Sequence, residues 1–141
     1  MRISSSSALL VGIAMSVSMP ALQGQEGKAL SQKTGVVSAE LFAGLVPDEG
    51  DKEITVLDVR YAPGGMNPRH FHPAAVTFYI LSGTPVFQEE GKAPVTLKPG
   101  ESLFAPAGTT HAHWNPSNSE GARWLEFIVA KKGQGRAIRK P

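Results

Sequence analysis

The sequence predicts an all-β protein, an antiparallel sandwich or barrel, from three observations. Short runs of alternating or β-branched residues recur from residue 54 to residue 130, with turn residues between them. The 141 residues include 15 glycines and 11 prolines, which separate these runs. No segment requires a helix longer than a turn or two.

The clearest strand runs from Ile54 to Tyr61, where strict alternation gives the segment two faces. Thr55, Leu57, Val59 and Tyr61 share one face, and Ile54, Val56, Asp58 and Arg60 share the other. Further strands are expected at residues 69–72, 76–81, 84–88, 95–98, 102–105, 111–115 and 123–130. Residues 36–46 fit either a strand with a short helix or one amphipathic helix.

The first 24 residues have the pattern of a secretory signal. Arg2 precedes a mostly apolar run at residues 8–19, and Pro20 and small residues follow it. This run is too short to cross a hydrocarbon core, which needs about 20 residues. We therefore expect cleavage between residues 21 and 24, a periplasmic or secreted protein, and no stable membrane anchor.

The remainder has the length of one domain. We divide it into an N-terminal arm at residues 25–50, a main domain at residues 51–131 and a basic C-terminal tail at residues 132–141. The chain has no cysteine, so neither disulfides nor thiolate ligands are available. The tail carries most of a basic cluster that begins at Lys131, and it is expected to be a solvated, mobile end. With a formal net charge of only +2, the chain is not expected to bind nucleic acid.

All four histidines lie in two short segments, His-Phe-His at 70–72 and His-Ala-His at 111–113. Prolines 68 and 73 argue against a helix around the first segment. In an extended strand, residues two apart point to the same side, so His70 and His72 can reach one ion. With His111 they would form a set of neutral imidazoles suited to Fe, Zn, Ni, Cu or Mn, with coordination positions left open.

The spacing around these histidines resembles that of the cupin family. Gly64, His70, His72 and Gly83 match its first motif, except that Val76 stands where the family has a glutamate. Gly100, Pro106, Gly108, His111 and Asn115 match its second motif completely. The resemblance implies a small single-domain RmlC-like protein, folded as an antiparallel jelly-roll barrel, also called a double-stranded β-helix.

The resemblance implies a divalent transition metal held by His70, His72 and His111. Without the glutamate, either the metal site has an extra open position or metal binding has been lost, and we favour a retained metal. His113 shares a face with His111 if residues 111–115 are a strand. It is a candidate fourth ligand or a hydrogen-bonding partner that orients the site, and the alternative is simple packing beside Trp114.

The expected pocket is apolar. If Val76 occupies the ligand position, Phe78 and Ile80 lie on the same inward face, and Phe87 and Phe104 are candidates for the same wall. Plain barrel core is the alternative for each of them. Asp58 and Glu126 lie inside expected strands, and we expect each to be a surface or interface residue, with an interior carboxyl of raised pKa as the alternative.

Two functions follow from the resemblance. The first is a metal-dependent enzyme, oxygenase-like or isomerase-like, acting on a small chelating organic molecule. The second is a non-catalytic module that binds or senses a metal or small ligand, which the missing glutamate favours. In either case a homodimer is expected, since cupins commonly pair through their sheets.

Overall fold

The structure, a computed structural model, describes residues 35–140, and within this range it contains strands and turns but no helix. The strands are β1 (Val36–Leu45), β2 (Lys52–Tyr61), β3 (Met66–Phe71), β4 (Ala75–Ser82), β5 (Val86–Glu89), β6 (Val95–Thr96), β7 (Ser102–Ala105), β8 (His111–Trp114), β9 (Ala122–Lys131) and β10 (Ile138–Arg139). The all-β prediction is confirmed.

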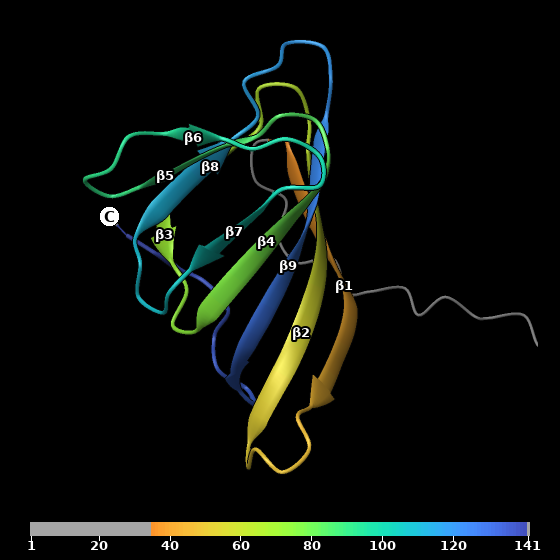
Figure 1. Cartoon of the computed structure of the whole chain (residues 1–141), viewed down its shortest axis with the longest axis vertical. Coiled ribbons are helices and arrows are strands. Elements are labelled where there is room, and N and C mark those ends of the chain that lie inside the picture. The colour runs from red at the N-terminus through yellow and green to blue at the C-terminus, as the bar shows by residue number, and fades with distance from the viewer. Residues whose placement is uncertain (1–34, 141) are drawn as a thin grey trace, which may run out of the picture.

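The strands form two five-stranded antiparallel sheets that make a jelly roll. The first sheet has the order β1-β2-β9-β4-β7, and the second has the order β10-β3-β8-β5-β6. Figure 1 shows the long strands of the first sheet side by side, with the shorter strands of the second sheet folded over one end. Neighbours distant in sequence, such as β2 and β9, pair along their full length.

Residues 36–46, whose sequence left strand and helix open, form strand β1. It pairs with β2 from Val36 to Leu45, with a register shift between Glu40 and Phe42. The first sheet therefore begins inside the segment that we expected to be an arm.

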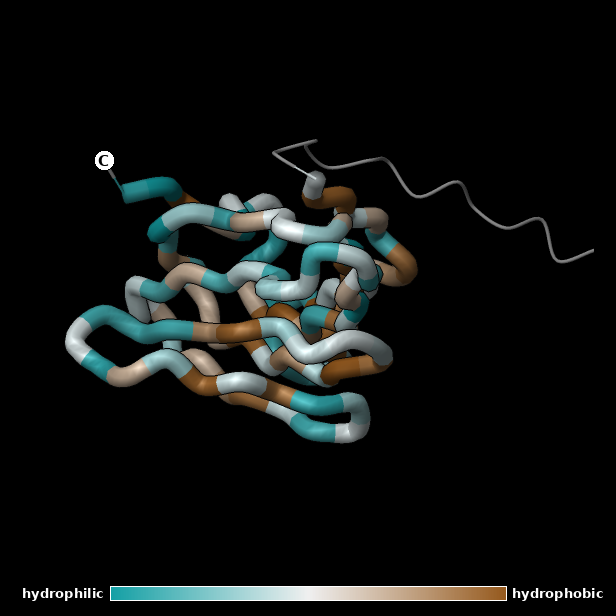
Figure 2. Tube along the Cα trace, turned by 90° about the horizontal axis from the view of Figure 1, so that it is seen from above, coloured by the Kyte–Doolittle hydropathy of each residue, from teal (hydrophilic) through white to brown (hydrophobic). Residues whose placement is uncertain are grey.

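The core lies between the two sheets and follows the predicted alternation. Leu57, Val59 and Tyr61 of β2 are buried, as are Phe78 of β4 and Trp124 of β9. Figure 2 shows the same alternation as hydrophobic and hydrophilic residues that succeed one another along the strands. Because inward positions are two residues apart, each strand presents a fixed set of side chains to the interior.

The glycines of the two motifs sit where the chain reverses direction. Gly64, Gly83, Gly100 and Gly108 all have positive φ angles, between 69° and 88°. Such backbone conformations are strained for residues with a Cβ atom, and at Gly83 an added Cβ would also lie 2.7 Å from the Gly121 carbonyl oxygen. These turns set the strand register that positions the histidines.

Asn115, the last residue of the second motif, is a structural residue in this chain. Its side chain is buried and donates hydrogen bonds to the carbonyl oxygens of Ala62 and Glu120, at 3.1 and 2.7 Å. Its Oδ1 atom accepts a hydrogen bond from the backbone nitrogen of Ser117. The side-chain amide therefore ties the loop between β2 and β3 to the loop between β8 and β9.

The C-terminal segment is exposed at every residue from 132 to 140 except Arg136, as expected of a solvated tail, but it is attached to the barrel. Strand β10 pairs with β3, with Ile138 opposite Phe71 and Arg139 opposite His70. The backbone nitrogen of Lys140 also donates to the carbonyl oxygen of Arg69. Residues 132–140 therefore return to the barrel beside the first histidine segment.

The expected secretory signal and residues 25–34 of the expected arm lie outside the described residues. Among residues 35–140, no helix is long and apolar enough to cross a membrane.

Candidate metal centre and pocket

The strand register brings the four histidines together inside the barrel. His70 on β3 lies directly opposite His111 on β8, and Asn67 lies opposite His113. His72 follows the end of β3 and points to the same side as His70. All four side chains are buried, with no more than 5% of any residue exposed.

Each histidine uses its Nδ1 atom in a hydrogen bond directed away from the centre. His70, His72 and His111 bond to the carbonyl oxygens of Pro68, Arg136 and Thr109, at 2.8, 2.6 and 2.9 Å. A carbonyl oxygen can only accept, so each of these Nδ1 atoms carries the proton. The Nε2 atom of each ring is therefore unprotonated when the imidazole is neutral, and that of His70 lies 3.4 Å from the side-chain nitrogen of Asn67.

His113 is held in a different way. Its Nδ1 atom and the hydroxyl of Tyr61 are 2.6 Å apart and share a hydrogen bond, in which Nδ1 donates when Nε2 is the atom that binds a metal. Burial raises the pKa of Tyr61, and the nearby Glu126 carboxylate raises it further, so the phenol stays protonated. Hydrogen bonds of this kind orient metal-binding imidazoles and fix their tautomers.

The ring positions define two overlapping groups of three. The rings of His70 and His111 are 4.5 Å apart between centroids, and His72 lies 5.1 and 5.2 Å from them. His113 lies 5.0 and 5.6 Å from the same two rings. His70 and His111 thus belong both to the predicted ligand group with His72 and to a second group with His113.

The second group has the tighter ligand geometry. One ring nitrogen each from His70, His111 and His113 lies within 4.8 Å of the other two, which allows one ion to bind all three. Two nitrogens that share an ion at about 2.0–2.1 Å can be at most about 4.2 Å apart. Only small side-chain adjustments are therefore needed for one ion to bind all three rings. His113 is thus at least as good a candidate ligand as His72.

The donor set fits a transition-metal ion. The Nε2 atoms of His72, His111 and His113 are buried and have no hydrogen-bond partner. Buried polar atoms without a partner are rare in folded proteins and indicate a missing ligand. Burial also lowers the pKa of His72 to about 4 and lowers that of His113 well below its ordinary value, so both rings are neutral at pH 7.

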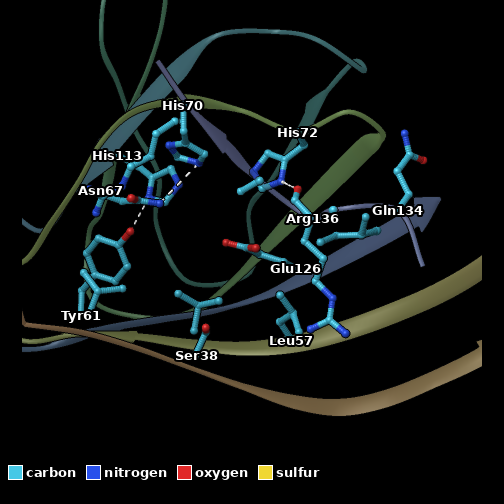
Figure 3. A pocket seen from close by; sticks show the side chains of 16 residues that line it. Ser38, Leu57, Tyr61, Asn67, His70, His72, His113, Glu126, Gln134 and Arg136 are labelled. Carbon is cyan, nitrogen blue, oxygen red and sulfur yellow. Dashed lines mark hydrogen bonds between the residues drawn. The ribbon is translucent and has the colours of Figure 1, made fainter. Parts of the chain in front are cut away.

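A pocket of about 450 Å³ opens beside the histidines. Figure 3 shows His70, His72 and His113 on one side of it, with Tyr61, Leu57 and Ser38 on the other. Apolar residues of β1, β2 and β9 form much of its wall, and the segment from Gln134 to Arg139 covers it from the C-terminal end. Three of the four histidines and the folded-back C-terminal segment therefore line the same pocket.

Glu126 faces this pocket from β9, contrary to the expectation of a surface or interface position. It is 6% exposed, and its Oε1 atom accepts a hydrogen bond of 3.1 Å from the indole nitrogen of Trp124. Burial raises the pKa of this carboxyl to about 7. The sequence carried the signal, because Ala122, Trp124 and Ile128 alternate with it on the inward face.

Asp58 instead belongs to an ion-pair cluster on the opposite face of the sheet, where it is only 4% exposed and is not the surface residue that we expected. Burial opposes ionisation of this carboxyl, but hydrogen bonds from Arg123 and Arg60 hold its pKa below the ordinary value. Asp58 is therefore a structural anion outside the pocket.

The predicted apolar pocket is partly wrong. Phe104 lies on the outer face of the first sheet and is 59% exposed, because β7 presents Leu103 and Ala105 inward. Val76, Phe78 and Ile80 are fully buried in the core, and none of them lines the large pocket. Phe78 and Phe87 instead pack against the histidine rings. The ring centroids are 5.8 Å apart for Phe78 and His111 and 5.1 Å apart for Phe87 and His113.

A family model described as "Cupin domain" matches residues 57–128, about half of the chain. Among curated proteins, the dimethylsulfoniopropionate lyase DddQ of Ruegeria pomeroyi is 44% identical over 55 residues, which cover 38% of this chain and 27% of that protein. The germin-like protein subfamily 3 member 1 of Arabidopsis thaliana is 29% identical over 108 residues, 71% of this chain and 52% of that protein. The chain thus spans about a quarter and about half of these two relatives.

Solved structures show the same fold at lower identity. The DddQ crystal structure from Ruegeria pomeroyi superposes with a TM-score of 0.65 at 22% identity, covering 81% of this chain and 61% of that one. A cupin-like protein from Thermotoga maritima superposes with a TM-score of 0.62 at 24% identity, covering 82% and 86% of the two chains.

The position of Glu126 predicts a specific pH dependence of stability. Because its pKa is higher in the folded protein than the ordinary 4.5, the unfolded chain loses this proton first as pH rises. The contribution of Glu126 to stability is therefore complete below about pH 4.5 and is lost as pH rises to about 7. Glu126→Gln should gain about 2 kcal/mol of unfolding free energy relative to the unsubstituted protein between pH 5 and pH 8.

The measurement is urea denaturation of chelator-treated protein at several pH values. Glu120→Gln, at an exposed glutamate, is the matched control and should show no such trend. A difference between the Glu126→Gln and unsubstituted proteins that stays constant across this pH range would contradict the interior position of the carboxyl.

Proposed function

Because the chain belongs to the cupin family, we propose that it is a metal-dependent enzyme that transfers a proton to or from a small chelating organic substrate. The single observation that carries this proposal is one pocket lined by His70, His72 and His113 together with the buried carboxyl of Glu126. A general acid or base works best when its pKa is near the working pH, and burial raises the pKa of Glu126 towards neutrality in the metal-free protein.

The histidines would hold the metal. His70 and His111 belong to both groups of three, and His113 and His72 complete the set from either side. When bound, a divalent transition metal acts as a Lewis acid on a substrate carbonyl or carboxylate oxygen. Three or four neutral donors leave its full positive charge in place, which suits an anionic substrate.

Glu126 would move the proton. The Trp124 indole binds Oε1, so Oε2 is the oxygen left to face the pocket (Figure 3). As a carboxylate it would remove a proton from the carbon next to the polarised group, and as an acid it would return that proton. Tyr61 keeps its phenolic proton and orients His113, which makes it a positioning residue.

The names of two similar proteins support this choice. DddQ is named as a lyase, and another protein of the same fold is the polyketide cyclase RemF from Streptomyces resistomycificus. An oxygenase reaction, which the open coordination positions would also permit, is the principal alternative. A non-catalytic metal-binding module is the second.

The metal site can be tested by replacing each histidine in protein made without a histidine tag. His70→Ala and His111→Ala should lower zinc affinity by roughly a hundredfold or more, since each residue belongs to both groups of three. His72→Ala and His113→Ala should each lower it by roughly tenfold, because one complete group of three histidines remains in each variant.

Calorimetric zinc titration and metal content by mass spectrometry measure these effects. Asn118→Ala, at an exposed loop position, is the control and should bind zinc normally. Equal and small effects of all four histidine substitutions would show that no ion binds at this centre.

Proton transfer can be separated from oxygen chemistry in one assay series. Protein loaded with Zn(II), Mn(II) or Fe(II) would be offered small keto-, hydroxy- and thio-carboxylates in deuterated water, with exchange and elimination followed by NMR. We expect turnover without oxygen, and its loss by at least tenfold in Glu126→Gln with unchanged metal content.

An oxygen electrode run in parallel reports the alternative. Substrate-dependent oxygen uptake that persists in Glu126→Gln would show an oxygenase. Metal and substrate binding without turnover in either assay would support the non-catalytic module.

We also propose that two copies pair through the outer face of the first sheet. Phe42, Val56, Phe127, Thr77 and Phe104 form one continuous row across five strands of this face. Phe42 and Phe104 at its two ends are more than half exposed, and Tyr79 and Val129 beside the row are also exposed. Contiguous apolar surface of this kind marks an interaction site.

Light scattering should therefore give the mass of a dimer for the unsubstituted protein and that of a monomer for Phe104→Glu. Val95→Glu changes a similarly exposed residue on the second sheet and should remain dimeric. A monomeric unsubstituted protein at micromolar concentration would refute the pairing.

A further inference from the structure

We propose that the C-terminal segment completes the pocket as an anion-binding strap, with Arg136 as the residue that binds a carboxylate of the substrate. This inference rests on the proposed function for the identity of the pocket, and it names the class of molecule that the pocket accepts: a small organic carboxylate.

The first observation is the state of the Arg136 guanidinium. Its Nη2 atom pairs with the carboxylate of Glu40 on β1, which fixes the end of the side chain against the first sheet. Its Nη1 atom is buried and has no hydrogen-bond partner. A buried guanidinium nitrogen without an acceptor is unfavourable, and a small shift of the side chain would let an anion in the pocket accept a hydrogen bond from it.

The second observation is the place of this side chain. Figure 3 shows Arg136 extending from the carbonyl beside His72, past Glu126, towards Leu57. The guanidinium therefore borders the same pocket as the histidines. A planar guanidinium matches the geometry of a carboxylate and can bind it through two parallel hydrogen bonds.

The third observation is the charge balance of the pocket. Its charged lining residues are Arg136, Arg139 and Glu126. Glu40 neutralises Arg136, and burial raises the pKa of the Glu126 carboxyl to about 7, so with Glu126 protonated the positive charge of Arg139 remains. An apolar pocket with this balance attracts a small organic anion.

The strap is also connected directly to the metal centre. The carbonyl oxygen of Arg136 accepts the Nδ1 hydrogen bond of His72, at 2.6 Å. Strand β10 holds the following residues against β3. One residue thus offers its backbone to a candidate ligand and its side chain to the substrate.

Binding of simple carboxylates by the full chain tests the inference directly. Propionate, malonate and succinate, with their neutral amides as comparators, would be titrated by calorimetry into chelator-treated and Zn(II)-loaded protein. We expect at least one carboxylate to bind at least tenfold more tightly than its amide, and Arg136→Gln to weaken that carboxylate by at least tenfold without changing amide binding.

Two variants separate recognition from structural support. Lys132→Gln removes a basic residue of the same segment that does not line the pocket, and it should bind normally. Glu40→Gln breaks the same ion pair as Arg136→Gln but keeps the guanidinium, so carboxylate binding should stay within threefold of the unsubstituted protein.

Each result bears on one claim. If no carboxylate binds preferentially, or if Glu40→Gln loses as much binding as Arg136→Gln, or if Arg139→Gln alone abolishes binding, the role given to Arg136 is wrong. Arg136-dependent binding in protein that takes up no zinc would leave this inference standing and refute the metal-dependent function. Zinc uptake without preferential carboxylate binding would refute this inference and leave the metal-dependent function standing.

Discussion

The outward hydrogen bonds of the histidine Nδ1 atoms are the constraint on which the site depends. Three of the acceptors are backbone carbonyl oxygens, which cannot donate, so the protonation of those rings is fixed by the fold. Burial keeps the rings neutral. The outward hydrogen bonds turn the other nitrogen of each ring towards the centre. The barrel therefore holds a set of lone pairs that its own side chains leave largely unsatisfied.

Much of this centre could be predicted from the sequence because its geometry has a period of two residues. His70 and His72, and likewise His111 and His113, share a face whenever the chain is extended, and the motif glycines fix the turns between strands. The sequence could not predict which three histidine rings lie closest together. That choice depends on register, which places His70 opposite His111.

The remaining parts of the pocket were missed for physical reasons that differ from residue to residue. Glu126 is a charged side chain in a strand, and its inward direction follows only from the apolar residues that alternate with it. Phe104 lies on an edge strand whose outer face looks as apolar as its inner one. The C-terminal segment attaches through backbone hydrogen bonds, which any sequence can make and no composition reveals.

The folded-back C-terminal segment has a practical consequence for handling the protein. The backbone of Lys140 is hydrogen-bonded to that of Arg69, the neighbour of a candidate ligand, and Arg139 lines the pocket, so this end of the described chain lies close to the pocket. An affinity tag of histidines at that end could reach the centre and bring its own bound nickel. Purification through an amino-terminal, removable tag avoids this contamination and leaves the entrance open to small molecules.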